Sequence, residues 1–187
     1  MKRLICCLAI AAIGTLTATA QDGERNFKRF KGDLSLGYAA PLGASSNGGI
    51  FALEPKFGVM DKLYLGLRME GAVIDFNGDL RSLSSYIATA DYYFTKNYSF
   101  RPFVGAGAGI FEIVNDVFNS DHVSKFKFGG IIRAGAEVKH FRFGIEYNFI
   151  PDTDITAYDN VGNVTKGKSK TGYIGIKAGF CFGGGPL

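Results

Sequence analysis

The stretch Phe141-Arg142-Phe143-Gly144-Ile145-Glu146-Tyr147-Asn148-Phe149 alternates bulky apolar residues with small, polar or charged ones. Side chains of a β-strand point to opposite faces with a period of two. One face of this strand is therefore a row of aromatic and aliphatic groups, and the other carries the arginine, glycine, glutamate and asparagine. A similar alternation recurs in about eight segments of the chain, which indicates a sheet protein.

The bulk of the apolar face decides which side of the sheet is inside. Most of the 17 Phe and 9 Tyr residues belong to the apolar faces, and the interior of a small barrel has no room for so many rings, whereas charged side chains and glycine fit there. The pattern predicts an all-β fold, an eight-stranded antiparallel up-and-down transmembrane β-barrel with its rings facing lipid. A soluble, secreted calycin-like barrel is the alternative, and it requires the rings to point inward.

The predicted strands have lengths that cross a bilayer when tilted, and the connections between them alternate between long and short, as in outer-membrane barrels. Four segments, 41–49, 74–83, 114–124 and 151–170, are expected to be the long loops. Pro55 cannot donate a ladder hydrogen bond, so we expect a bulge or a local break in the second strand. The eight strands are expected at about 32–40, 50–59, 62–73, 84–94, 101–113, 125–138, 141–149 and 171–182.

The first twenty residues have the pattern of a secretory signal peptide. Lys2-Arg3 precede an apolar stretch, and Ala18-Thr19-Ala20 form a small-residue cleavage site, so cleavage is expected after Ala20. An uncleaved membrane anchor is the alternative. Cleavage removes two of the three cysteines and leaves Cys181, which excludes an internal disulfide. The expected organisation is a signal peptide (1–20), a short periplasmic lead-in (21–31), the barrel (32–182) and a C-terminal tail (183–187).

Charged residues at inward positions of the strands are close to balanced in number. Unpaired charges in a water-poor lumen are costly, so we expect these side chains to form a paired network that fills the interior. A barrel of this size has room for side chains and not for a channel, which predicts a plug and not a pore. The predicted lumen network comprises Asp33, Glu54, Lys56, Arg68, Glu70, Asp91, Lys127, Arg133, Glu137, Arg142, Glu146 and Lys177.

Few residues suggest catalysis or ligand binding. His122 lies near Asp121 and Ser124 in an expected outer loop, and Ser–His groupings serve nucleophilic catalysis, but a solvated loop explains three common residues equally well. No metal-ligand spacing is present, and the glycines of 105–109 alternate as in a strand and do not open a helix as a dinucleotide fingerprint would. We expect no catalytic residues, no cofactor and no metal. The net charge of +4 is dispersed, which excludes a nucleic-acid footprint.

Several segments resemble the small outer-membrane β-barrels of Gram-negative bacteria, the OmpA-type and OmpX-type barrels. The resemblance lies in Leu53-Glu54-Pro55-Lys56-Phe57-Gly58-Val59, in Arg101-Pro102-Phe103-Val104-Gly105-Ala106-Gly107-Ala108-Gly109, and in Gly175-Ile176-Lys177-Ala178-Gly179-Phe180-Cys181-Phe182. It implies an outer-membrane barrel whose closing strand is recognised by the barrel-assembly machinery. We expect a monomer in contact with outer-membrane lipid and lipopolysaccharide. Here the tail 183–187 follows that strand, whereas members of the family often end on the aromatic residue itself.

The expected function is non-enzymatic: a structural or surface-interaction role carried by the extracellular loops. Two alternatives stay open. One is an enzyme that modifies lipid A or phospholipid, for which His122 and Ser124 are the only candidate residues. The other is a small passive channel or transporter of small hydrophobic molecules. A basic patch of Lys166, Lys168 and Lys170 in the last loop suits acidic groups of lipopolysaccharide, although a solvated loop accounts for it as well.

Overall fold

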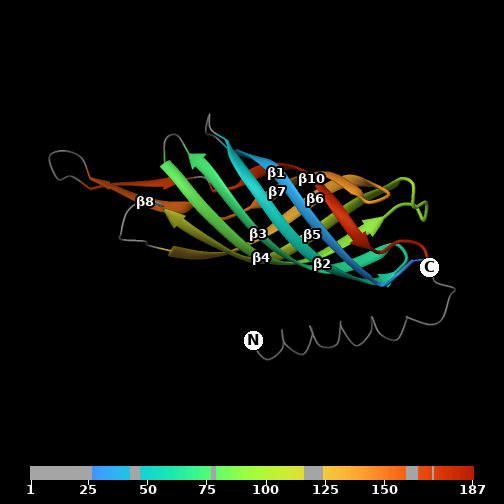
Figure 1. Cartoon of the computed structure of the whole chain (residues 1–187). Helices are drawn as coiled ribbons and strands as arrows, with labels where there is room; N and C mark the ends of the chain where they lie inside the picture. The colour runs from blue at the N-terminus through green and yellow to red at the C-terminus, as the bar shows by residue number, and fades with distance from the viewer. Residues whose placement is uncertain (1–26, 43–46, 77–78, 116–123, 159–163, 170) are drawn as a thin grey trace, which may run out of the picture.

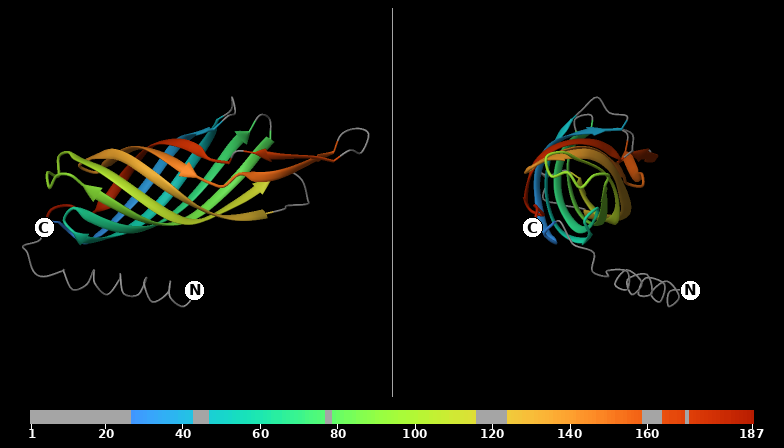
Figure 2. Two further views of the ribbon diagram at one scale, coloured as in Figure 1. Left: turned by 180° about the vertical axis from the view of Figure 1, so that it is seen from behind. Right: turned by 90° about the vertical axis from the view of Figure 1, so that its right-hand side faces the viewer.

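The computed structural model describes residues 27–42, 47–76, 79–115, 124–158, 164–169 and 171–187. Within them, eight strands close into an antiparallel barrel in the order β1-β10-β7-β6-β5-β4-β3-β2 (Figures 1 and 2). This confirms the predicted fold class. The barrel strands are β1 (Phe30–Pro41), β2 (Gly48–Met60), β3 (Leu63–Phe76), β4 (Asp79–Tyr93), β5 (Arg101–Asn115), β6 (Ser124–Val138), β7 (Phe141–Phe149) and β10 (Tyr173–Gly183).

The barrel is apolar outside and polar in the middle of its lumen. In β7, Phe143 and Ile145 are 50 % and 53 % exposed, whereas Arg142 and Glu146 are 8 % and 6 % exposed. An outward row of rings and aliphatic groups with an inward row of charges is the arrangement of a lipid-facing barrel wall. Within the described part of the chain, no helix is both long and apolar enough to cross a bilayer.

Strand β3 passes through successive layers of the lumen from one end of the barrel to the other. Its buried residues, in chain order, are Tyr64, Arg68, Glu70, Ala72 and Ile74. The layers are therefore an aromatic layer near the termini, a charged middle and an apolar layer near the long loops. The neighbouring strand repeats the order in reverse, because it runs antiparallel to β3.

Two predicted loops contain paired strands. Segment 74–83 was expected to be a loop, but β3 and β4 stay paired up to Phe76 and Asp79. Segment 151–170 was expected to be a loop, but β8 (Thr153–Tyr158) and β9 (Val164–Ser169) form a separate hairpin that extends beyond the barrel (Figure 1). Strands that project past the membrane need no apolar outer face, so they lack the alternation that marks the spanning strands.

Pro55 locally interrupts one of the two ladders of β2. On the β1 side, Pro55 stays in register opposite Gly32. On the β3 side, the described pairing stops at Leu53 and resumes at Lys56 in the same register. The local break follows from the missing N–H of proline, and the register shift of this hairpin lies nearer its turn, between Gly58 and Met60.

The two ends of the barrel domain meet at one rim. Phe27 forms a β-bridge with Pro186, and the Lys28 amide donates to the Gly185 carbonyl (2.9 Å). Strand β1 starts at Phe30, two residues before its predicted start. The last residues therefore pair with those before β1 instead of forming a separate tail. The predicted signal peptide and cleavage site lie outside the described residues.

Candidate functional site

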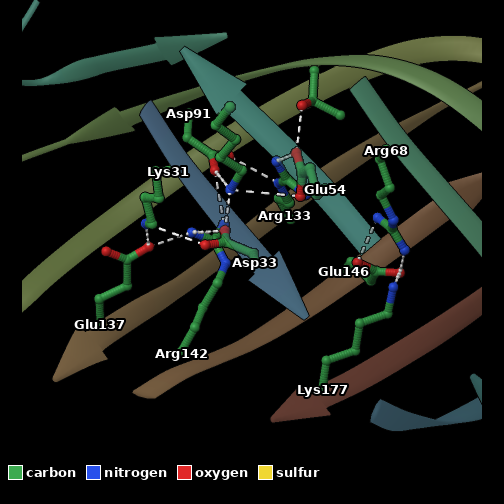
Figure 3. A network of polar contacts seen from close by, with 12 residues as sticks. Lys31, Asp33, Glu54, Arg68, Asp91, Arg133, Glu137, Arg142, Glu146 and Lys177 are labelled. Atoms are coloured by element: carbon green, nitrogen blue, oxygen red, sulfur yellow. Dashed lines mark hydrogen bonds and ion pairs between the residues drawn. The ribbon is translucent and has the colours of Figure 1, made fainter. Parts of the chain in front are cut away.

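The lumen holds two groups of charged side chains, and Figure 3 shows them on either side of a gap. In the group nearer the termini, here called the lower cluster, the Lys56 ammonium donates to Asp33 Oδ2 (2.5 Å) and to Asp91 Oδ2 (2.6 Å). Lys31 donates to Glu137 and to the hydroxyl of Tyr93 (2.8 Å for the latter). These contacts connect strands β1, β2, β4 and β6 across the interior.

Two arginines complete the lower cluster. Arg133 donates from Nε to Asp91 Oδ1 (2.8 Å) and from both terminal nitrogens to Glu54 (2.8 and 2.6 Å). Arg142 donates to Asp91 Oδ2 (2.8 Å) and to Glu137 Oε1 (2.6 Å). The Asp91 carboxylate is fully buried and lies between one lysine and two arginines. Such charge-assisted bonds satisfy a carboxylate that water does not reach.

The upper cluster spans the full width of the barrel. Arg68 on β3 makes a bidentate pair with Glu146 on β7, at 2.8 and 2.6 Å, and also donates to Glu70. Lys177 on β10 donates to Glu70 and lies 2.9 Å from Glu146. The Tyr173 hydroxyl donates to Glu70 as well. Each carboxylate of this cluster therefore contacts one cation from across the barrel: Glu146 contacts Arg68, and Glu70 contacts Lys177.

Charges in the two clusters balance, and glycine makes room for them. A Cβ atom added to Gly105 would lie 2.1 Å from Asp91 Oδ1, so only glycine permits this approach. Pairing within a buried network compensates for the desolvation of its ions, and removing one partner leaves an uncompensated charge. The cations are Lys31, Lys56, Arg68, Arg133, Arg142 and Lys177, and the anions are Asp33, Glu54, Glu70, Asp91, Glu137 and Glu146.

Packed side chains close the lumen above and below the charges. At the end near the termini, the Arg101 guanidinium lies between the rings of Phe27 and Tyr93, 4.3 and 4.2 Å from their centroids, and donates to the Asp61 carbonyl (2.8 Å). Between the clusters is a hollow of about 30 Å³, which is large enough to hold water. At the loop end, one apolar cluster comprises Ala39, Ile50, Ala72, Ile74, Leu83, Ile87, Phe111, Ile113, Ile131, Ile150 and Tyr173.

Solved structures of three bacterial barrels share this architecture. Neisserial surface protein A (NspA) is 18 % identical, with a TM-score of 0.60 over 82 % of this chain and 95 % of its own. The outer membrane protein OprG of Pseudomonas aeruginosa is 14 % identical, with a TM-score of 0.56 over 87 % and 100 %. The N-terminal β-barrel domain of Pseudomonas aeruginosa OprF is 15 % identical, with a TM-score of 0.52 over 83 % and 99 %. No family model and no curated protein matches the sequence.

This is the fold of the small outer-membrane β-barrels. In this outer-membrane-type barrel, eleven of the twelve residues expected in the lumen network lie in the two clusters just described. The exception is Lys127. Its ammonium lies at the loop-side rim and donates to the Asp152 carbonyl (2.6 Å). Lys127 has the inward parity of its strand, but its position on β6 lies beyond Gly130, the last residue paired with β7.

Several side chains of the lumen were not predicted from the sequence. Lys31 was expected in the lead-in, but it occupies the first inward-facing position of β1 and pairs with Glu137. The inward apolar residues Ile87, Phe111 and Ile131 were also not recognised as lumen residues. The signal for them was present: each occupies the same strand face as the charged residues, two or more positions nearer the loops.

A buried group with metal-binding ligand types lies in the lower cluster. Atoms of Asp33, Glu137 and the Cys181 thiol are all within 4.8 Å of one another. The Lys31 ammonium contacts Glu137 and lies 3.5 Å from Asp33 Oδ1. Because these two carboxylates already have a cation between them, we assign the group to the charge network.

Of the two histidines, the structure describes His140. His140, in the turn between β6 and β7, donates from Nδ1 to the Cys181 carbonyl (3.0 Å) and stacks on Phe180. These contacts hold the turn against the end of β10. His122 and the side chain of Ser124 lie outside the described residues, so the proposed Ser–His grouping remains a prediction.

Proposed function

We propose that the chain is a non-enzymatic outer-membrane barrel with a structural or surface-interaction role, carried by the segments that connect its strands at the loop side. The observation that carries the proposal is the contrast between an apolar exterior and a lumen that packed side chains close at both ends and ion-paired charges occupy between them. A barrel with a filled lumen contributes its outer wall and its exposed ends to the cell envelope, and the hairpin of β8 and β9 projects beyond the wall.

The proposed location is the outer membrane, which suits the apolar exterior of the barrel. The chain is exported by a signal peptide cleaved after Ala20 and inserted into the outer membrane by the barrel-assembly machinery. It resides there as a monomer in contact with lipid and lipopolysaccharide. By their own descriptions, NspA is a surface protein and OprG is an outer membrane protein, which supports this location without specifying a ligand.

Fractionation of cells expressing the full chain tests the location. We expect the mature protein in the outer-membrane fraction, beginning at Gln21, with faster migration in unboiled than in boiled gel samples. The migration difference arises because a closed barrel resists detergent until it is heated. Recovery of the mature protein as a soluble periplasmic species would overturn the proposal.

Conductance separates the plugged barrel from a channel. We expect purified protein in planar bilayers to show no steady single-channel current, because paired charges and the apolar cluster occupy the lumen. Steady current in wild-type protein would favour the transport alternative. Uptake of a small hydrophobic dye into liposomes provides the matching test for uncharged solutes.

The enzymatic alternative depends on His122. We expect His122→Ala and wild-type cells to have identical lipid A and phospholipid profiles by mass spectrometry, because His122, Asp121 and Ser124 are common residue types that a solvated loop explains. A lipid species that disappears in the variant, while the protein level in the membrane is unchanged, would replace our proposal with a lipid-modifying enzyme.

A further inference from the structure

The outer wall has an open hollow where β5, β6, β7 and β10 pass side by side. Its volume is about 480 Å³. Ala134 on β6 pairs with Val104 on one side and Ile145 on the other, and the small alanine forms a depression between larger neighbours. Arg133 and Glu146 also border the hollow, which places it at the level of the charge clusters.

A second hollow lies at the loop-side rim of the same wall. Its volume is about 540 Å³. It forms because β7 ends at Phe149 while β6 continues for six more residues without a described partner on that side. Gly129 and Gly130 leave its floor without side chains, and Phe128 and Phe149 border it.

The two hollows meet at one side chain. Tyr147 borders both, and the two hollows together are here called the β6–β7 groove. The groove runs from the rim to the level of the charge clusters. Its lower part is bordered by Val104, Ile132, Ala134, Ile145, Tyr147 and Ile174.

One positive charge lies beside the upper end of the groove. The Lys127 ammonium donates to the carbonyl of Asp152, which borders the rim hollow. An ammonium has three N–H donors, and one carbonyl contact leaves capacity for an anion. The groove therefore has a cation at the membrane surface and an apolar path toward the bilayer centre, which is the polarity of one lipid molecule in one leaflet.

We propose that the β6–β7 groove binds an anionic lipid of the loop-side leaflet, with one acyl chain over Ala134 and the headgroup beside Lys127. The inference rests on the proposed membrane location. A second copy of the chain fits the groove less well, because a two-fold contact uses the same patch on both molecules and brings the two Lys127 side chains toward each other.

Native mass spectrometry of the detergent-purified full chain tests the acyl-chain contact, with dimyristoyl phosphatidylglycerol as the probe. We expect Ala134→Phe to weaken retention of this lipid about tenfold, because the ring fills the hollow and removes apolar contact area. Ala88→Phe is the matched control: it makes the same change at an exposed alanine of β4, on another part of the wall, and we expect no loss.

The headgroup contact is tested by comparing phosphatidylglycerol with phosphatidylcholine of the same chain length. We expect Lys127→Gln to abolish the preference for the anionic lipid, and Lys96→Gln, at the opposite rim next to Asp61, to preserve it. Equal retention by Ala134→Phe and Ala88→Phe would overturn the inference. So would a dimer that Ala134→Phe converts to monomer, because a second copy would then occupy the groove.

The same samples separate this inference from the proposed function. Heat-dependent migration and outer-membrane recovery are measured for each variant. If wild-type protein is a membrane barrel but lipid retention is unaffected by filling the groove, only the lipid site fails. If wild-type protein is not in the membrane, the proposed function fails and the lipid site fails with it.

Discussion

Arg68 and Glu146 form a bidentate ion pair across the full diameter of the barrel. Strand β3 carries the arginine and β7 carries the glutamate, and these strands are four places apart in the ring of eight. The pair therefore connects opposite walls, which no strand-to-strand hydrogen bond does. Its geometry is that of a guanidinium fork on a carboxylate, the strongest ordinary form of ion pair.

Breaking this pair from one side is expected to destabilise the barrel strongly. Arg68→Met leaves Glu146 buried with less compensation, and we expect a loss of about 3–5 kcal/mol in the free energy of unfolding. The Arg68→Met/Glu146→Met double variant should lose much less, because Glu70 and Lys177 still pair with each other. Urea unfolding in lipid vesicles measures both. A double variant as unstable as the single variant would contradict the compensation argument.

An exposed ion pair provides the control for that series. Lys96 pairs with Asp61 at 3.0 Å, but its side chain is 52 % exposed. Pairs exposed to solvent contribute about 0–1 kcal/mol, so Lys96→Met should leave the unfolding transition almost unchanged. A loss comparable to that of Arg68→Met would show that burial does not set the cost.

The two faces of the barrel predict opposite responses to the same substitution. Phe111 is fully buried in the apolar cluster, whereas Phe128 is 70 % exposed on the outer wall. We expect Phe111→Ala to cost about 3–5 kcal/mol, because it leaves a cavity. Phe128→Ala should cost far less, since lipid chains are as apolar as the lost ring and replace its contacts. Unfolding in vesicles compares the two, and equal losses would argue against a lipid-facing wall.

Spin labels test the orientation of the wall directly. Labels at Phe143 and Ile145, both about half exposed on β7, should be accessible to oxygen and shielded from a water-soluble nickel complex in bilayers. A label at Lys96, in the turn near the termini, should show the reverse. Nickel accessibility at Phe143 and Ile145 equal to that at Lys96 would place this face in water and refute the membrane orientation.

The turn between β6 and β7 contains a strained residue. Lys139 has a φ of 54°, in the left-handed region that disfavours side chains with a Cβ. We expect Lys139→Gly to raise the free energy of unfolding by about 1 kcal/mol, because glycine adopts this conformation freely. His140→Gly is the control and should destabilise, since it removes the contacts with Phe180 and the Cys181 carbonyl. A destabilised Lys139→Gly variant would contradict the strain assignment.

The candidate site was predictable where parity alone decides it. Alternation along β7 correctly assigns Arg142 and Glu146 to the inside, because a strand's side chains switch faces at every residue. It also assigns Lys127 to the inside, but the ladder between β6 and β7 ends at Gly130, so Lys127 contacts Asp152 at the rim instead. Where a neighbouring strand ends is a property of the closed barrel and not of the β6 sequence.

Two further differences have the same origin. Lys31 looks like part of a polar lead-in until β1 is paired with β10, when it lies opposite Gly183 and reaches Glu137. Ile74 and Leu83 look like loop residues because the apolar alternation that marks membrane strands weakens there. In the folded chain they are buried in the apolar cluster of the lumen.

The amino-acid sequence by itself determined the eight barrel strands, the two faces of each strand and the placement of apolar residues outside and charged residues inside, because these depend on local periodicity and side-chain size. Only the tertiary structure decided which charges pair, where the lumen turns apolar and where the wall is hollowed. Those features depend on strand register around a closed ring, which brings residues such as Arg68 and Glu146 together from opposite walls. The alternation of residues along one strand does not show which strands face each other across the barrel.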